Sequence, residues 1–158
     1  MLEILKRLLA PQPAALPDPD ARLALAALLV RVAKADGTYD LPEITRIDRV
    51  LAMRFSLNPV EAAQLRAQAE QLEADAPDTV RFTRAIKDAV PFESRVGVVE
   101  ALWSVVLADG ARADEEAALL RMLAPMLGLS DPESALARQR AEAALAAQGV
   151  GTEPGRPV

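Results

Sequence analysis

The chain has 158 residues, 51% of them apolar and only 3% aromatic, with a formal net charge of −5. This length suits one compact domain, and the apolar content is ample for a core. The absence of cysteine and histidine excludes thiol redox chemistry, disulfides, Cys/His zinc sites and nucleophiles activated by imidazole. The negative charge disfavours nucleic-acid binding and favours a cationic ligand or a protein partner.

Residues 1–10 (MLEILKRLLA) show leucines at helical spacing around Lys6 and Arg7, which predicts a short amphipathic helix. Docking on the domain is favoured, with contact to a membrane surface as the alternative. This segment lacks the features of a signal peptide, so we expect a cytoplasmic protein. Prolines then predict an extended linker that continues to residue 19.

Residues 20–75 are predicted to form a first set of three helices. Asp20 caps a helix that continues to Ala35, and Gly37 is suited to the left-handed conformation just past its end. Asp40, with Glu43 three residues later, predicts a capping box at the start of the second helix. The pair Asn58-Pro59 opens the third helix, which is expected to end near residue 74.

A linking helix is predicted over residues 78–90, and a second set of three helices over about 93–148. The first of these is expected over residues 92–108, followed by Gly110, and the next over residues 114–127, stopped by Gly128. Asp131-Pro132 opens the last helix, which we expect to end near Gln148. Glycine and proline in residues 149–158 predict a disordered tail.

The two sets of helices repeat the same pattern at an offset of 73 residues. Ala35-Asp36-Gly37 returns as Ala108-Asp109-Gly110, Glu43 aligns with Glu116, and Asn58-Pro59 aligns with Asp131-Pro132. The register holds across two helices without a gap. Because Ala and Leu dominate and β-branched runs are few, the sequence predicts an all-α domain of about seven to eight helices, built from two pseudo-symmetric repeats.

This duplicated Ala-Asp-Gly turn, with an acidic residue seven positions after each Asp, resembles the TerB-like family, named after a tellurite-resistance protein. The resemblance covers residues 20–148, and two further segments, 81–85 (RFTRA) and 99–103 (VEALW), are similar to the small stand-alone bacterial branch. It implies an all-α domain without assigned enzymatic activity, whose acidic turn residues bind divalent cations. The chain departs from the pattern at Pro42, just before Glu43, and at Ala113, which stands where Asp40 would align.

The acidic turns predict candidate ligands for a hard cation such as Ca²⁺ or Mg²⁺, which prefers carboxylate oxygens. The spacing matches only the second half of an EF-hand loop, since Val32 and Lys34 would fill its first ligand positions and cannot bind calcium. An EF-hand is therefore excluded, and a smaller ligand set at each turn remains. The candidate metal ligands are Asp36, Asp40, Glu43, Asp109 and Glu116.

The alternative interpretation needs no metal, because Asp40, Glu43 and Glu116 all suit the beginning of a helix. Asp36 and Asp109 fit it less well, since the end of a helix disfavours an anion by about 0.3–1 kcal/mol. A metal ion, a cation such as Lys34, or backbone amides in the turn could each offset that cost.

The sequence thus favours a non-enzymatic binding protein of the TerB-like family that binds a divalent cation and acts in a stress or envelope-associated response. The alternative is a metal-free helical scaffold for an unidentified protein partner, in which the turns are only helix caps. No other cofactor is expected. Serine catalysis is disfavoured without an imidazole base, and Trp103 is expected in the core. The basic stripe of Arg81, Arg84 and Lys87 is interpreted as a solvated face.

Overall fold

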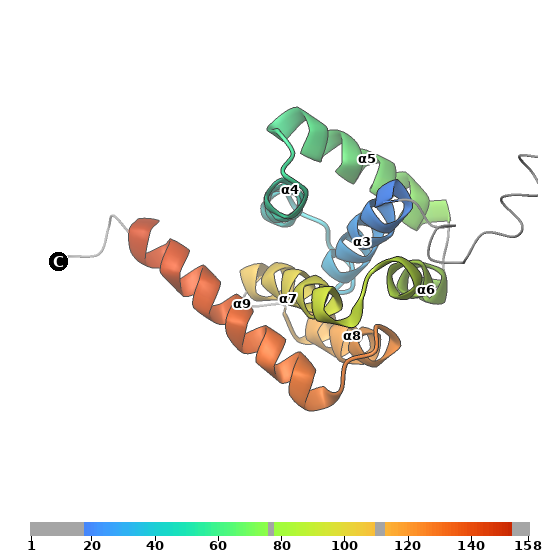
Figure 1. The fold of residues 1–158 in the computed structure, drawn as a ribbon. Helices are drawn as coiled ribbons and strands as arrows, with labels where there is room; N and C mark the ends of the chain where they lie inside the picture. Colours follow the sequence, from blue (N-terminus) through green and yellow to red (C-terminus); the bar gives the residue numbers. More distant parts are fainter. Residues whose placement is uncertain (1–17, 76–77, 110–112, 153–158) are drawn as a thin grey trace, which may run out of the picture.

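The computed structural model describes residues 18–75, 78–109 and 113–152, and within these ranges it is helical without any β-strand (Figure 1). The predicted all-α fold is confirmed. The predicted helix over residues 1–10 and most of the proline-rich linker lie outside the described residues. The helices are α3 (Asp18–Ala33), α4 (Leu41–Phe55), α5 (Pro59–Asp75), α6 (Thr79–Ala89), α7 (Phe92–Asp109), α8 (Ala113–Met126) and α9 (Asp131–Thr152).

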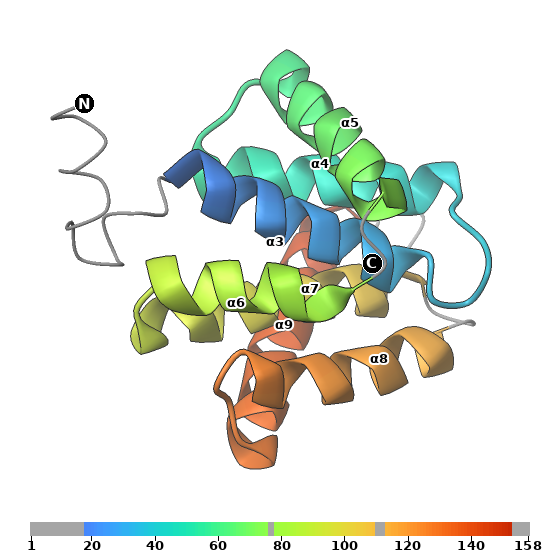
Figure 2. The same cartoon turned by 90° about the vertical axis from the view of Figure 1, so that its right-hand side faces the viewer.

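Two central helices, α3 and α7, form the core. Every residue of α3 from 24 to 30 is buried, and α7 buries Val99, Leu102, Trp103 and Val106. A helix that is apolar on all sides must be covered on all sides. Accordingly α4 and α5 lie on one side of this pair, α8 and α9 on the other, and α6 packs along α3 (Figure 2). Trp103 also donates a buried hydrogen bond from Nε1 to Ser134 Oγ of α9, at 3.2 Å.

Several helix ends follow the sequence signals. Asp40 and Glu43 form the predicted capping box at the start of α4. Asp78 accepts a hydrogen bond from the Val80 amide and so caps α6. Gly37 and Gly128 both adopt the left-handed conformation, with φ of 87° and 90°. These residues fix where the chain turns between helices.

Other ends differ from the prediction. Helix α3 begins at Asp18, so Asp20 lies in the first turn of the helix and not at its cap. Pro19 does not break the helix, because proline is tolerated in the first turn. It ends at Ala33, because the amide of Ala35 donates to the carbonyl of Val32 and tightens the chain into a turn. Helix α9 continues to Thr152, four residues into the expected tail, since terminal glycines weaken a helix by only about 1 kcal/mol each.

Within the described residues, three helices precede α6 and three follow it, in the predicted order. The pseudo-symmetry between the two sets stays a prediction, as do the domain limits at residues 20 and 148. Among the described residues, every helix is too short or too polar to cross a bilayer.

Candidate metal centre

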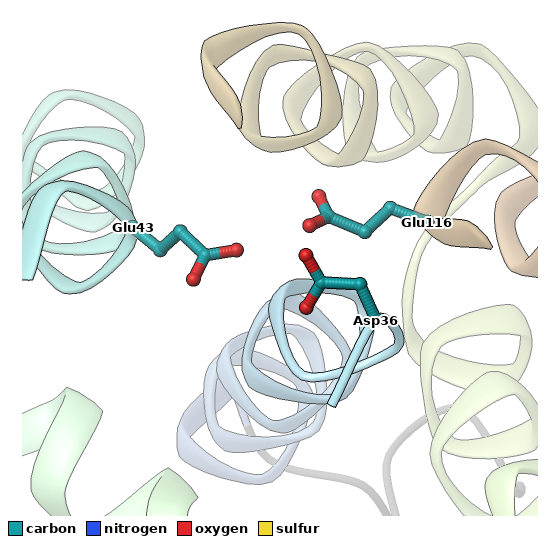
Figure 3. Close-up of side chains that lie close together, drawn as sticks. All are labelled: Asp36, Glu43 and Glu116. Carbon is teal, nitrogen blue, oxygen red and sulfur yellow. The ribbon is translucent and has the colours of Figure 1, made fainter. Parts of the chain in front are cut away.

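Three carboxylates from separate elements meet at one place in the fold. Asp36 comes from the turn after α3, Glu43 from the first turn of α4, and Glu116 from the first turn of α8. One oxygen from each lies within 4.8 Å of the others, and the side chains point toward one another (Figure 3). The sequence predicted two acidic turns, and the structure joins residues of both in one cluster, called here the acidic cluster.

Asp36 is held by its own turn. Its Oδ1 accepts hydrogen bonds from the amide and the hydroxyl of Thr38, at 3.0 and 2.9 Å, while Oδ2 is buried. The backbone amide thus offsets part of the cost of an anion near a helix end. Lys34, the other candidate for that role, instead places its ammonium 2.8 Å from Glu73 Oε1 on α5.

Glu43 has a role in the helix cap and a place in the acidic cluster. Its Oε1 accepts a hydrogen bond from the amide of Asp40 at 2.9 Å, and its Oε2 is buried. Only 3% of the residue is exposed. Asp40 is exposed and lies outside the acidic cluster, so the structure places it at the cap but not with the other candidate ligands.

Glu116 is fully buried, with both carboxylate oxygens shielded from solvent. Its neighbours Asp114 and Glu115 in the same turn are exposed. Asp109 is the last residue of α7, but its side chain and residues 110–112 are outside the described part of the chain. Among the described residues, the second acidic turn therefore contributes Glu116 to the acidic cluster.

The acidic cluster concentrates negative charge in a poorly solvated place. Two ionised carboxylates 4.8 Å apart repel by about 3 kcal/mol at an effective dielectric constant near 20. Positive charge or bound protons must offset this repulsion. Two oxygens bound to the same Ca²⁺ can lie up to about 4.8 Å apart, and two bound to Mg²⁺ up to about 4.2 Å. The spacing and the all-oxygen donor set therefore suit Ca²⁺, and suit Mg²⁺ after a small contraction.

A hydrogen-bonded network fastens the first acidic turn to α5. The Tyr39 hydroxyl donates to Glu70 Oε2 at 2.7 Å, and Arg66 donates to the same oxygen at 3.1 Å and to Asp48 of α4 at 2.6 Å. Burial, followed by the bond to Glu70, raises the pKa of Tyr39, so the phenol stays a donor. This network holds the turn that carries Asp36 in a defined position.

A second anchor to α5 lies one turn further along that helix. Glu73 accepts hydrogen bonds from Arg31 Nε at 3.1 Å and from Lys34 at 2.8 Å. Neither anchor is predicted from the sequence. The available signal was weak: Glu70 and Glu73 are three residues apart and so share one face of α5.

A comparison with protein families agrees with the geometry. The model of the family described as "Tellurite resistance protein TerB" matches residues 22–139. No curated protein and no solved structure gave a significant match. The matching model does not distinguish the branches of the family, so the assignment to the small stand-alone bacterial branch stays a prediction. Because the match spans well over half of the chain and the fold is all-α as the resemblance implied, the chain belongs to the TerB family.

Proposed function

We propose that this protein is a non-catalytic binding protein that takes up a divalent cation, Ca²⁺ or Mg²⁺, in the acidic cluster. The observation that supports this most strongly is the meeting of Asp36, Glu43 and Glu116 within 4.8 Å, although Glu43 and Glu116 are 73 residues apart in the sequence. A cation there would bind carboxylates from both halves of the chain and offset their repulsion.

Burial favours a ligand role over a purely capping role. A carboxylate that caps a helix needs only one oxygen near a backbone amide. It can cap an exposed helix end as well as a buried one. Glu116 instead has both oxygens buried, and Glu43 has its second oxygen buried beyond the one that caps α4. Buried carboxylate oxygens gathered in one place favour binding of a cation over a role as helix caps alone.

The proposal is tested by calorimetric titration of Ca²⁺ and Mg²⁺ into the wild type and two variants. Glu116→Gln keeps the shape of the side chain but removes its charge, and we expect it to weaken binding at least tenfold. Glu115→Gln makes the same chemical change at an exposed neighbour and serves as the matched control, with unchanged affinity. For the wild type, a cation at a hundredfold excess over its Kd should add about 2.7 kcal/mol to the free energy of unfolding.

The metal-free scaffold makes the opposite prediction. If the turns are only caps, the melting temperature should be the same in EDTA and in millimolar Ca²⁺. The melting temperature of Glu116→Gln should then be as insensitive to Ca²⁺ as that of the wild type. Equal heats of titration for the wild type and Glu116→Gln would contradict the metal proposal.

Family membership supports the wider part of the proposal, which is a role in a stress or envelope-associated response. With no thiol in the chain, such a role would depend on binding rather than on reduction of an oxyanion. Complementation of a deletion strain by the wild type, but not by Glu116→Gln, is the expected result.

A further inference from the structure

A groove follows the face of α4 that is turned away from α5. Its first part has a volume of about 400 Å³ and is lined by residues of α4, α7 and α9. These three helices are labelled in Figure 1. Its second part, about 380 Å³, lies between the beginning of α4 and the end of α7, at Ala108. Because Arg46 and Arg49 line both parts, the two lie side by side along α4, and together they are called here the groove. From Leu41 to Arg54 it follows α4 for about 20 Å, given the rise of a helix.

The groove is basic, although the chain as a whole is acidic. Arg46, Arg49 and Arg54 line it, against a single carboxylate, Glu100. Neither Arg46 nor Arg49 forms an ion pair with any residue that the structure describes. Burial and then the charge of Arg49 lower the pKa of Arg46, as expected for neighbouring cations that lack a local anion.

The third arginine is fixed in place at one end of the groove. Arg54 donates a hydrogen bond to the carbonyl of Ser94 at 3.2 Å, and its guanidinium lies against Gly97 of α7. A Cβ atom at residue 97 would approach Arg54 Nη1 to 3.0 Å, so glycine allows the arginine to cross α7 closely. The positive charge at this end is thus part of the packed structure.

The rest of the lining is apolar. Met53 and Leu41, at opposite ends of the groove, are 74% and 72% exposed. The wall formed by α9 presents Ala141, Ala144 and Leu145. The two alanines are small and leave room for the backbone of a bound segment. Large exposed apolar side chains beside arginines are typical of a binding surface rather than of an ordinary solvated face.

We propose that this groove binds an amphipathic acidic helix of a partner protein. Carboxylates of that helix would pair with Arg46 and Arg49, and its apolar side chains would contact Met53, Leu41 and the alanine wall of α9. A groove of about 20 Å accommodates roughly 13 residues of helix, which is close to four turns. Charge complementarity identifies the occupant as acidic.

Two other occupants fit less well. Residues 1–10 of the same chain carry Lys6 and Arg7 against one acidic residue, so their net charge has the wrong sign. A bilayer with anionic lipids has the right sign, but a flat surface cannot enter a groove that is walled by α4 and α9. A narrow helix satisfies both the charge and the shape.

The test uses the full chain in EDTA and a synthetic peptide of about 18 residues, with leucines at helical spacing and glutamates elsewhere. We expect saturable binding by calorimetry that weakens with salt. Arg46→Glu/Arg49→Glu should weaken it by about tenfold or more, because attraction becomes repulsion. Met53→Ala, at an exposed position, should weaken it by about threefold.

The matched control is Arg81→Glu/Arg84→Glu, which makes the same change in net charge at exposed positions on α6. It should bind the peptide as the wild type does, and circular dichroism should show native helix content in all variants. Equal losses in both double variants would contradict the proposal, since net charge alone would then explain binding. Equal binding of a scrambled peptide with the same composition would contradict it too, and so would no binding at all.

Vesicles of phosphatidylglycerol provide the last comparison. If they retain the protein through Arg46 and Arg49 while the peptide does not bind, the groove recognises lipid and the proposal is wrong. Because EDTA removes any divalent cation, none of these outcomes depends on the acidic cluster.

Discussion

Asp36 carries its negative charge three residues beyond the end of α3, where free carbonyl groups disfavour an anion. The turn makes this position acceptable, because Thr38 donates two hydrogen bonds to Asp36 Oδ1. The conformation of this turn depends on Gly37, whose φ of 87° is costly for most other residues. The local backbone therefore fixes where this carboxylate points before any ligand is present.

Gly37→Ala should lower the free energy of unfolding by about 1 kcal/mol, the cost of forcing an L-residue into the left-handed region. No atom lies within 4 Å of the position of the new Cβ, so the effect should be purely conformational. Urea denaturation measures it. Gly37→Asn is the control and should cost less, because asparagine tolerates this conformation. Equal losses for both variants would point to a steric cause.

At the scale of helices, α3 and α5 are joined by ion pairs as well as by apolar packing. The Glu73 side chain is only 11% exposed and accepts hydrogen bonds from Arg31 of α3 and from Lys34, the residue just after α3. Burial raises the pKa of Glu73, but the hydrogen bonds from Lys34 and Arg31 outweigh burial and leave it below the ordinary value of 4.5. The folded state therefore favours the charged form of Glu73.

This shift predicts how the stability of the α3–α5 contact depends on pH. A depressed pKa contributes stability that is complete above the unfolded-state pKa, near 4.5, and is lost as the pH falls through the folded-state pKa. Glu73→Gln should therefore cost about 1–2 kcal/mol at pH 7, and the difference from the wild type should shrink below pH 4.5. Chemical denaturation at several pH values gives the measurement. Gln71→Ala, at an exposed position of α5, is the control, and a difference as large at pH 3 as at pH 7 would contradict this account.

The sequence predicted those helix ends and turns that depend on residues close by in the chain. Capping residues and left-handed glycines located the beginning of α4 and the end of α8, and the end of α3 to within two residues, because each acts within a few residues of itself. The sequence also placed Asp36, Glu43 and Glu116 among the candidate ligands. It could not predict that Glu43 meets Glu116, or that Tyr39 reaches Glu70, because such contacts depend on how helices pack.

At the scale of the whole molecule, the central position of α3 makes each half dependent on the other. Residues 24–30 of α3 are all buried, and α3 packs against α4 and α5 of its own half, against the linking helix α6, and against α7 and α8 of the other half. The acidic cluster spans the same boundary. Neither half has an apolar core that is closed without its neighbour.

A fragment ending at Val90 should therefore fail to unfold cooperatively. Removal of α7 and α8 exposes one side of α3, and each leucine that becomes exposed costs roughly 1.5–3 kcal/mol. Thermal melts followed by circular dichroism should show a broad, shallow transition. The full chain, which is the control, should melt sharply. A sharp transition in the fragment would show that the first half is an independent folding unit.

The distance along the sequence between Glu43 and Glu116 has a consequence for synthesis. Asp36 and Glu43 leave the ribosome first, and Glu116 follows 73 residues after Glu43. Closing a loop of that length costs about 4 kcal/mol in chain entropy. An ion that requires all three carboxylates can be captured only once the last of them has been translated. Until Glu116 has been translated, the growing polypeptide would therefore be stabilised by its helices alone, and the proposed ion would add stability only after that point.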